Sequence, residues 1–183
     1  MVAHPKVRFL ATDIWDAPDD DKRYEVIDGK LYVNPAPDWM HQYALGALFT
    51  ILSNWVRSHR LGKIVQAPVG VILNVHNGVE PDIVYITHDQ EGVITKRGVE
   101  GAPDLIVEAL SPSTEARDRG IKMRRYAASG VPHYWLLDIA NRSLEAYRPG
   151  KGAYERVGVF ASGATFEPAL FPGLQIPIAA LWE

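Results

Sequence analysis

Cysteine is absent from this chain of 183 residues. Disulfide bonds, thiolate metal sites and cysteine nucleophiles are therefore excluded, and any metal chemistry must use carboxylates, histidines or carbonyl oxygens. Long apolar runs are missing as well. No stretch reaches the length of a membrane span, and residues 1–10 hold no apolar core of a signal peptide. We expect a soluble, cytoplasmic protein.

An excess of positive charge is also lacking, because 19 lysines and arginines stand against 22 acidic residues and the net charge is −3. A nucleic acid would have to bind through a local basic patch rather than through bulk attraction to phosphate. Hydrophobic residues make up 47% of the chain, which is enough for one sizeable core. We expect one domain spanning residues 1–183.

The N-terminal half predicts a hairpin followed by a long helix. Residues 23–27 and 30–34 flank Asp28-Gly29, a pair that suits the positive φ angles of a type I′ turn. Apolar residues at three-and-four spacing then predict a helix over about 39–61, and Gly62 is placed to end it. A β-hairpin and one helix are expected here.

Strands dominate the remainder of the predicted α/β (α+β) fold. Pro68 and a predicted turn at Asn77-Gly78 separate three segments rich in valine and isoleucine. A second helix should begin near Thr114 and stop at Gly130, with Gly120 weakening its middle. The predicted strands cover residues 63–67, 69–74, 81–86, 104–110, 133–138, 143–148 and 154–160.

Two acids stand where the sequence should be apolar. Glu108 lies inside Leu-Ile-Val-Glu-Ala-Leu, and Asp82 opens Ile-Val-Tyr-Ile. Because burial of an unpaired carboxylate costs several kcal/mol, something must compensate Glu108. One interpretation pairs it with Arg117, Arg119, Arg124 or Arg125. The other lets the carboxylates of Asp82 and Glu108 converge on a divalent cation, for which oxygen ligands are suited.

A series of motifs resembles the Uma family, whose members are restriction-endonuclease-like proteins of the PD-(D/E)XK nuclease superfamily. The resemblance covers about residues 23–148. It implies a restriction-endonuclease-like fold, in which helices flank a central mixed sheet, and a metal-dependent nuclease acting on DNA or another nucleic acid. The motifs are Arg-Tyr-Glu-Val-Ile-Asp-Gly from residue 23, His41, Pro81-Asp82, Pro-Asp-Leu-Ile-Val-Glu-Ala-Leu-Ser-Pro-Ser-Thr from residue 103, Asp118, Lys122, and Gly-Val-Pro-His-Tyr-Trp-Leu-Leu-Asp from residue 130.

The resemblance also implies roles for single residues. Asp82 matches the aspartate of the P-D motif, Glu108 the acid of the (D/E)-x-K motif, and Glu25 an additional N-terminal acid. The chain departs from the pattern at Leu110, where that motif calls for a lysine; Lys122 on the following helix is the matching residue. The implied cofactor is Mg²⁺, with Mn²⁺ as a substitute, held by Asp82, Glu108 and the carbonyl of Ala109.

Other readings stay open from the residues alone. His41 can line the site or cap its helix, Asp104 can be a site acid or an entry-turn residue, and Ser111 can line the site or cap a helix. Leu110 and the acidic charge also permit a nuclease-like domain that binds nucleic acid or a protein partner without cleaving it. A homodimer could form through the edge strands within residues 143–160.

Overall fold

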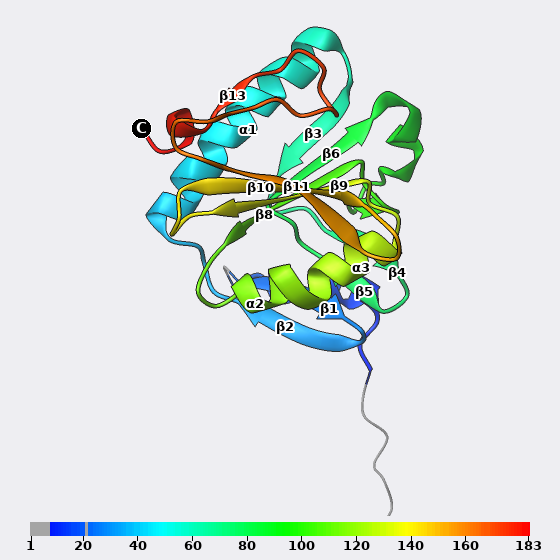
Figure 1. Cartoon of the computed structure of the whole chain (residues 1–183). Coiled ribbons are helices and arrows are strands. Elements are labelled where there is room, and N and C mark those ends of the chain that lie inside the picture. The colour runs from blue at the N-terminus through cyan, green and yellow to red at the C-terminus, as the bar shows by residue number, and fades with distance from the viewer. Residues whose placement is uncertain (1–7, 21) are drawn as a thin grey trace, which may run out of the picture.

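The computed structural model describes residues 8–20 and 22–183, so the expectation about a signal peptide falls mostly outside the described residues. Within them, no helix combines the length and the apolar character that crossing a membrane requires. A six-stranded mixed sheet forms the centre of the fold (Figure 1). Its order is β11 (Tyr154–Ala161), β10 (Ser143–Pro149), β9 (His133–Asp138), β8 (Leu105–Leu110), β6 (Ile83–Thr87) and β3 (Gly62–Gln66).

A smaller five-stranded sheet lies below the central sheet in the view of Figure 1. The expected hairpin forms one end of it, and Asp28 and Gly29 both have positive φ, as a type I′ turn requires. Its order is β2 (Lys30–Asn34), β1 (Arg23–Ile27), β5 (Asn77–Val79), β4 (Val71–Asn74) and β7 (Val99–Glu100). The short strands β12 (Thr165–Phe166) and β13 (Ile176–Pro177) pair near the C-terminus.

The central sheet buries side chains on both faces, as the apolar run of β8 predicted. Leu105, Val107 and Ala109 pack in the core that includes α1 (Trp39–His59) and the C-terminal segment. Ile106 and Leu110 pack in a second core, together with Ile27 and Val71 of the smaller sheet and with Tyr126. This alternation is that of a central strand, and it places Glu108 in the layer between the two sheets.

The second predicted helix forms in three connected pieces. Glu115–Arg117 (α2) is α-helical, Asp118–Lys122 makes a π-helical turn, and Met123–Ala128 (α3) is α-helical again. The helix stops before Gly130, whose φ is +86°. The expected end is therefore confirmed, and Gly120 lies in the middle of the π-helical turn.

Two glycine predictions were wrong for the same reason. Arg60, with φ 54°, ends α1, whereas Gly62 begins β3, where an added Cβ would collide with the carbonyl oxygen of Ile86. Asn77 and Gly78 lie within β5, and residues 75–76 make the turn. A Cβ at Gly78 would collide with the carbonyl oxygen of Ala11. Both glycines allow a close backbone approach instead of terminating an element.

Candidate active site

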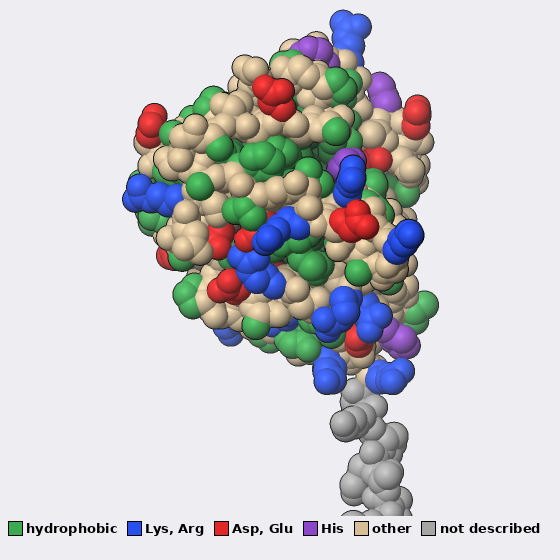
Figure 2. Space-filling model, viewed as in Figure 1, with side chains coloured by type: hydrophobic (Ala, Val, Ile, Leu, Met, Phe, Trp, Pro, Cys, Tyr) green, Lys and Arg blue, Asp and Glu red, His purple; other side chains and the backbone are tan. Residues whose placement is uncertain are grey.

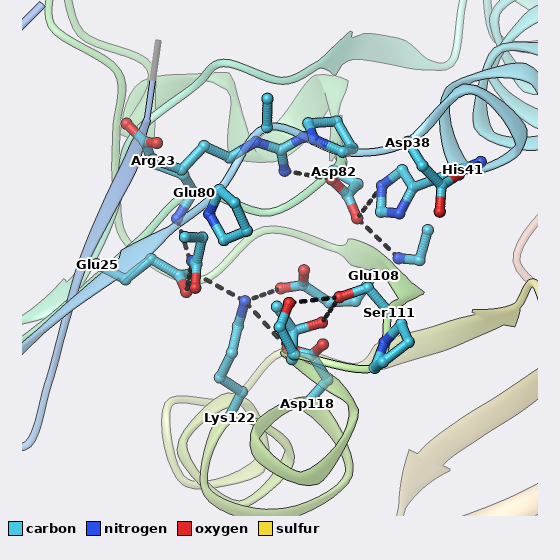
Figure 3. A pocket seen from close by; sticks show the side chains of 18 residues that line it. Arg23, Glu25, Asp38, His41, Glu80, Asp82, Glu108, Ser111, Asp118 and Lys122 are labelled. Atoms are coloured by element: carbon cyan, nitrogen blue, oxygen red, sulfur yellow. Dashed lines mark hydrogen bonds and ion pairs between the residues drawn. The ribbon is translucent and has the colours of Figure 1, made fainter. Parts of the chain in front are cut away.

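A cavity of about 250 Å³ lies where the two sheets meet the second helix (Figure 3). Its wall is built from β1, from the loop that joins β2 to α1, from the residues just before β6, from the end of β8 and from the helix beyond it. The lining residues are Arg23, Glu25, Asn34, Pro35, Ala36, Pro37, Asp38, His41, Glu80, Asp82, Glu108, Ala109, Ser111, Pro112, Ser113, Thr114, Asp118 and Lys122.

Asp82 occupies one side of this cavity. The backbone N–H of Ala109 donates to its Oδ2 at 2.7 Å, and the guanidinium of Arg23 donates to its Oδ1. The Nε2 atom of His41 lies 3.6 Å from Oδ2. Burial favours the neutral acid, but the neighbouring His41 and Arg23 outweigh it and lower the pKa of Asp82 to about 2. Asp82 is therefore a carboxylate at neutral pH.

Lys122 occupies the other side, where its ammonium is surrounded by acids. The side chain is 4% exposed, and Nζ lies 2.8 Å from Glu25 Oε1, 2.7 Å from Glu108 Oε1 and 3.4 Å from Asp118 Oδ1. Burial alone would lower the pKa of this amine, yet these carboxylates raise it well above its ordinary value. Lys122 is a fixed positive charge inside the cavity.

The surroundings of Glu108 disfavour its charge. Burial, together with Asp118, Asp82 and Glu25, raises its pKa well above the ordinary value despite the nearby Lys122. The hydroxyl of Tyr126 donates to Oε1 at 2.6 Å. The nearby side chains therefore do not fully compensate the negative charge of a Glu108 carboxylate.

The arginine interpretation of Glu108 was wrong, because its cationic partner is Lys122. Arg117 donates to Asn34, Arg119 to Asp138 and Glu145, and Arg125 to Asp28. Arg23, which that interpretation did not include, pairs with Asp82.

Glu25 reaches the cavity from β1. Asn34 Nδ2 donates to its Oε2 at 3.0 Å, and the backbone N–H of Glu80 donates to its Oε1 at 3.2 Å. Burial opposes ionisation, but Lys122 and Asn34 lower its pKa below the ordinary value. Glu25 is thus bound to the same ammonium as Glu108.

Negative charge exceeds positive charge in the cavity wall. The acids are Glu25, Asp38, Glu80, Asp82, Glu108 and Asp118, whereas the lysines and arginines are Arg23 and Lys122. Burial and the charge of Glu25 also raise the pKa of Glu80. On the face shown in Figure 2, by contrast, basic and acidic side chains are interspersed. That face therefore does not share the imbalance of the cavity.

The donor set suits a hard divalent cation. Across residues 8–20 and 22–183, no three histidine or acidic side chains form a ready-made metal cluster. Mg²⁺, however, commonly binds through one or two carboxylates and takes its other ligands from water and substrate phosphate. Asp82 and Glu108 supply two carboxylates to one cavity, and Ala109 lies beside them in its wall.

Of the three weaker candidates, two line the cavity and one does not. His41 and Ser111 line the cavity, and Asp38, rather than His41, caps α1 by accepting from the backbone N–H of His41 at 2.9 Å. Asp104 does not line it. Its Oδ2 instead accepts from the backbone N–H of Thr87 at 2.7 Å and from the Thr87 hydroxyl at 3.0 Å, because it lies at the opposite end of β8.

Sequence reasoning gave no role in the site to Arg23, Asp118 or Tyr126. Asp118 and Tyr126 stand four residues before and four residues after Lys122, so helical spacing could have placed them beside it. Arg23 contacts Asp82 across 59 positions of sequence, and no local pattern connects the two.

Comparison with known proteins first defines the class of fold. A crystal structure described as a putative nuclease belonging to DUF820, from Anabaena variabilis, superposes with a TM-score of 0.78. The match covers 95% of this chain and 97% of that chain at 19% sequence identity. This chain adopts the expected fold, a mixed sheet flanked by helices with an N-terminal hairpin, and that crystal structure shares its overall architecture.

Sequence comparison then identifies the family. The model of the Uma2 family, described as "Putative restriction endonuclease", matches residues 11–179, so the chain belongs to this family. The resemblance read from the motifs is confirmed and extends beyond residues 23–148. An uncharacterized protein of Synechocystis, slr1290, is 31% identical over 125 residues. That match spans 68% of this chain but only 64% of the relative.

Proposed function

We propose that this protein is a Mg²⁺-dependent nuclease that hydrolyses phosphodiester bonds, with DNA as its substrate. The observation that carries the proposal is that Asp82, Glu108 and Lys122 all face one cavity, although 26 and 14 residues separate them along the chain (108 minus 82, and 122 minus 108). Membership of a family described as restriction endonucleases supports the same activity.

The roles follow from the contacts. Asp82 and Glu108 would hold the divalent cation, with the carbonyl of Ala109 as a further ligand. When bound, such a cation polarises a phosphate and makes a coordinated water more acidic. The Nζ atom of Lys122, 2.7 Å from Glu108, would stabilise negative charge that develops on the phosphate or orient the attacking water. Glu25 keeps this ammonium in place.

A second candidate is a nuclease-like domain that binds nucleic acid without cleaving it. The ion pair between Arg23 and Asp82 favours this reading, because it already engages one of the two proposed ligands. Leu110, in the position where the (D/E)-x-K motif has a lysine, favours it as well. Cleavage thus requires that Arg23 and Lys122 share their carboxylates with the cation.

A cleavage assay tests the proposal. Single-stranded and double-stranded DNA and RNA would be incubated with Mg²⁺ or Mn²⁺ and with the wild type, Asp82→Asn or Glu108→Gln. Glu115→Gln is the matched control, because Glu115 is an exposed acid on α2 outside the cavity wall. We expect each cavity variant to lose about 100-fold or more of the rate, since each loss removes transition-state stabilisation, while the control keeps its activity.

Two results would contradict the nuclease. Equal cleavage by the wild type and Glu108→Gln would show that the activity comes from a contaminant. Binding of nucleic acid without cleavage under any of these conditions would support the second candidate instead.

A further inference from the structure

His41 contributes an unusual side chain to the wall of the candidate active site. It lies in the first turn of α1, and its side chain is 8% exposed. Within the part of the chain that the structure describes, neither Nδ1 nor Nε2 has a hydrogen-bond partner, and Nε2 lies 3.6 Å from Oδ2 of Asp82, beyond hydrogen-bond distance. A histidine ring carries at least one N–H, whichever nitrogen holds the hydrogen. The cavity wall therefore holds a buried donor that lacks an acceptor among the described residues.

Local structure explains the backbone of His41 but not its ring. The backbone N–H donates to Oδ1 of Asp38, the residue that caps α1, at 2.9 Å. The buried side chain of Lys122, by contrast, donates to Oε1 of Glu25 at 2.8 Å. Buried polar groups in folded proteins nearly always have a partner, so an unpaired one calls for an explanation. A ligand with an acceptor atom in the cavity would supply the missing partner.

Arg23 lies beside the same carboxylate and is less restrained than Lys122. Its guanidinium donates to Oδ1 of Asp82, whereas His41 lies beside Oδ2, and Figure 3 shows both side chains directed at Asp82. Among the described residues, the Arg23 side chain is 20% exposed and pairs with one acid, whereas Lys122 is 4% exposed and contacts three. The backbone N–H of Ala109 also holds Oδ2 at 2.7 Å, so Asp82 has a second anchor when Arg23 leaves it.

Phosphate is the ligand that suits these two donors. A guanidinium presents paired N–H groups that match two phosphate oxygens, and hydrogen bonds between charged groups are the stronger ones. The cavity wall carries an excess of acids, which repel a phosphodiester unless cations and donors offset them. Once Asp82 binds a divalent cation, Arg23 needs another anion. The phosphate of a substrate in the cavity is that anion.

We propose that Arg23 and His41 together bind the scissile phosphate of the substrate, on the side of the cavity opposite Lys122 (Figure 3). In the free protein Arg23 pairs with Asp82. In the substrate complex its guanidinium and the ring N–H of His41 donate to the phosphate oxygens. This inference rests on the proposed function, which supplies both the cation on Asp82 and the phosphodiester. Recognition of the phosphate thus falls to two residues that are not ligands of the cation.

Binding of DNA and binding of the cation, measured separately, test this phosphate site. Fluorescein-labelled DNA, single-stranded or double-stranded, would be titrated with the full chain in Ca²⁺, which takes oxygen ligands as Mg²⁺ does, and followed by fluorescence anisotropy. A denaturing gel checks that the DNA stays intact. The affinity for Mn²⁺ is measured from the electron paramagnetic resonance signal of the free ion.

The variants remove the donors one at a time. Arg23→Gln removes the guanidinium, Arg23→Lys keeps the charge without the paired donors, and His41→Leu removes the ring N–H. The controls are Arg57→Gln, at an exposed position in the last turn of α1, and His88→Leu, whose side chain is 68% exposed. Neither control residue lines the cavity.

We expect Arg23→Gln and His41→Leu to weaken DNA binding by about 10- to 100-fold, because each loses hydrogen bonds to a charged group. Arg23→Lys should weaken it by about 3- to 10-fold, since only the paired donors are lost. Lysine also keeps a counter-ion for Asp82, so this variant decides the matter if Arg23→Gln does not fold. The affinity for Mn²⁺ should stay the same or rise in all three variants, and both controls should behave as the wild type does.

Three outcomes would overturn the phosphate site. They are unchanged DNA binding by either Arg23→Lys or His41→Leu, the absence of DNA binding by the wild type in Ca²⁺, and a parallel loss of affinity for DNA and Mn²⁺. The last would mean that these residues only hold Asp82 in place. Failure of the nuclease proposal gives a different result, namely DNA binding that depends on Arg23 and His41 without cleavage when Mg²⁺ is supplied.

Discussion

Lys122 shows how strongly one buried side chain can organise its neighbours. Its ammonium contacts three carboxylates, and all four side chains are at most 5% exposed. Each of these charges would be costly to bury alone, and the mutual contacts offset that cost. The geometry of the cavity therefore depends on this lysine, whether or not it takes part in chemistry.

Replacement of Lys122 with methionine should destabilise the protein by about 3–5 kcal/mol, because it leaves buried carboxylates without a cation. Urea denaturation would measure the free energy of unfolding. Lys63→Met, at an exposed position of β3, is the control and should change stability by no more than about 0.5 kcal/mol. Equal stability of the two variants would show that the cluster contributes little.

Glu108 should oppose stability at neutral pH. Burial raises the pKa of Glu108 above the ordinary 4.5, so the folded protein favours its neutral form. Below pH 4.5 the group is neutral in both the folded and the unfolded protein and does not lower the free energy of unfolding. As the pH rises through the raised pKa, the buried group ionises and the protein loses stability. A glutamine side chain is uncharged at every pH and resembles the neutral form of glutamic acid. Glu108→Gln should therefore unfold at a higher temperature than the wild type at neutral pH in a chelator.

Thermal unfolding at several pH values checks the direction of this difference in stability. The difference between Glu108→Gln and the wild type should shrink toward zero below pH 4.5. A variant that is less stable than the wild type at neutral pH would mean that the ion pair with Lys122 outweighs the cost of burying the charge.

Some site residues were predictable at this scale and others were not. Glu108 and Asp82 could be found because an acid is conspicuous in an apolar segment, and both line the cavity. Asp104 showed the same signal but bonds to Thr87 instead. Pattern alone does not report at which end of a strand an acid lies relative to a cavity.

At the scale of elements, the π-helical turn at Asp118–Lys122 is the feature that shapes the site. Asp118 and Lys122, at its two ends, are both buried and face the same cavity. Single π-helical turns inside α-helices are rare and occur frequently at functional sites. The sequence indicated a weak point at Gly120 but not a change of hydrogen-bond pattern there.

Gly120→Ala should stabilise the protein by about 0.5–1 kcal/mol. Gly120 has no positive φ, and a Cβ added there would meet no atom within 4 Å, so alanine should only reduce the freedom of the unfolded chain. Chemical denaturation measures the effect. A loss of stability would show that the π-helical turn needs glycine at this position.

Gly62→Ala should have the opposite effect and destabilise the protein. Gly62 has φ 145°, and a Cβ there would collide with the backbone of Ile86, so the same substitution should cost more than about 1 kcal/mol. The error of reading Gly62 as a helix end has the same origin. Glycine permits both left-handed backbone and close approach, and only the partner strand decides which is needed.

At the scale of the whole molecule, the order of strand and helix segments was largely predictable, whereas the partition into two sheets was not. The segments that became β3 and β4 follow one another in sequence but belong to different sheets. The smaller sheet is joined by pairing of Val26 with Gly78, a contact that spans 52 positions (78 minus 26). Such long-range pairing leaves no periodic trace in the sequence.

This partition creates the site. The smaller sheet contributes Arg23 and Glu25, the central sheet contributes Glu108, and the helix beyond β8 contributes Asp118 and Lys122. The acids meet only because the two sheets close against that helix, and their combined charge exceeds that of the cations beside them. We propose that a divalent cation completes this balance.

Crystals of the wild type soaked with Mn²⁺ test that statement most directly, because anomalous scattering locates the ion itself. We predict one peak between the carboxylates of Asp82 and Glu108, and its loss in crystals of Glu108→Gln. The absence of a peak in the wild type, with Arg23 still on Asp82 and Lys122 still on Glu108, would contradict the account.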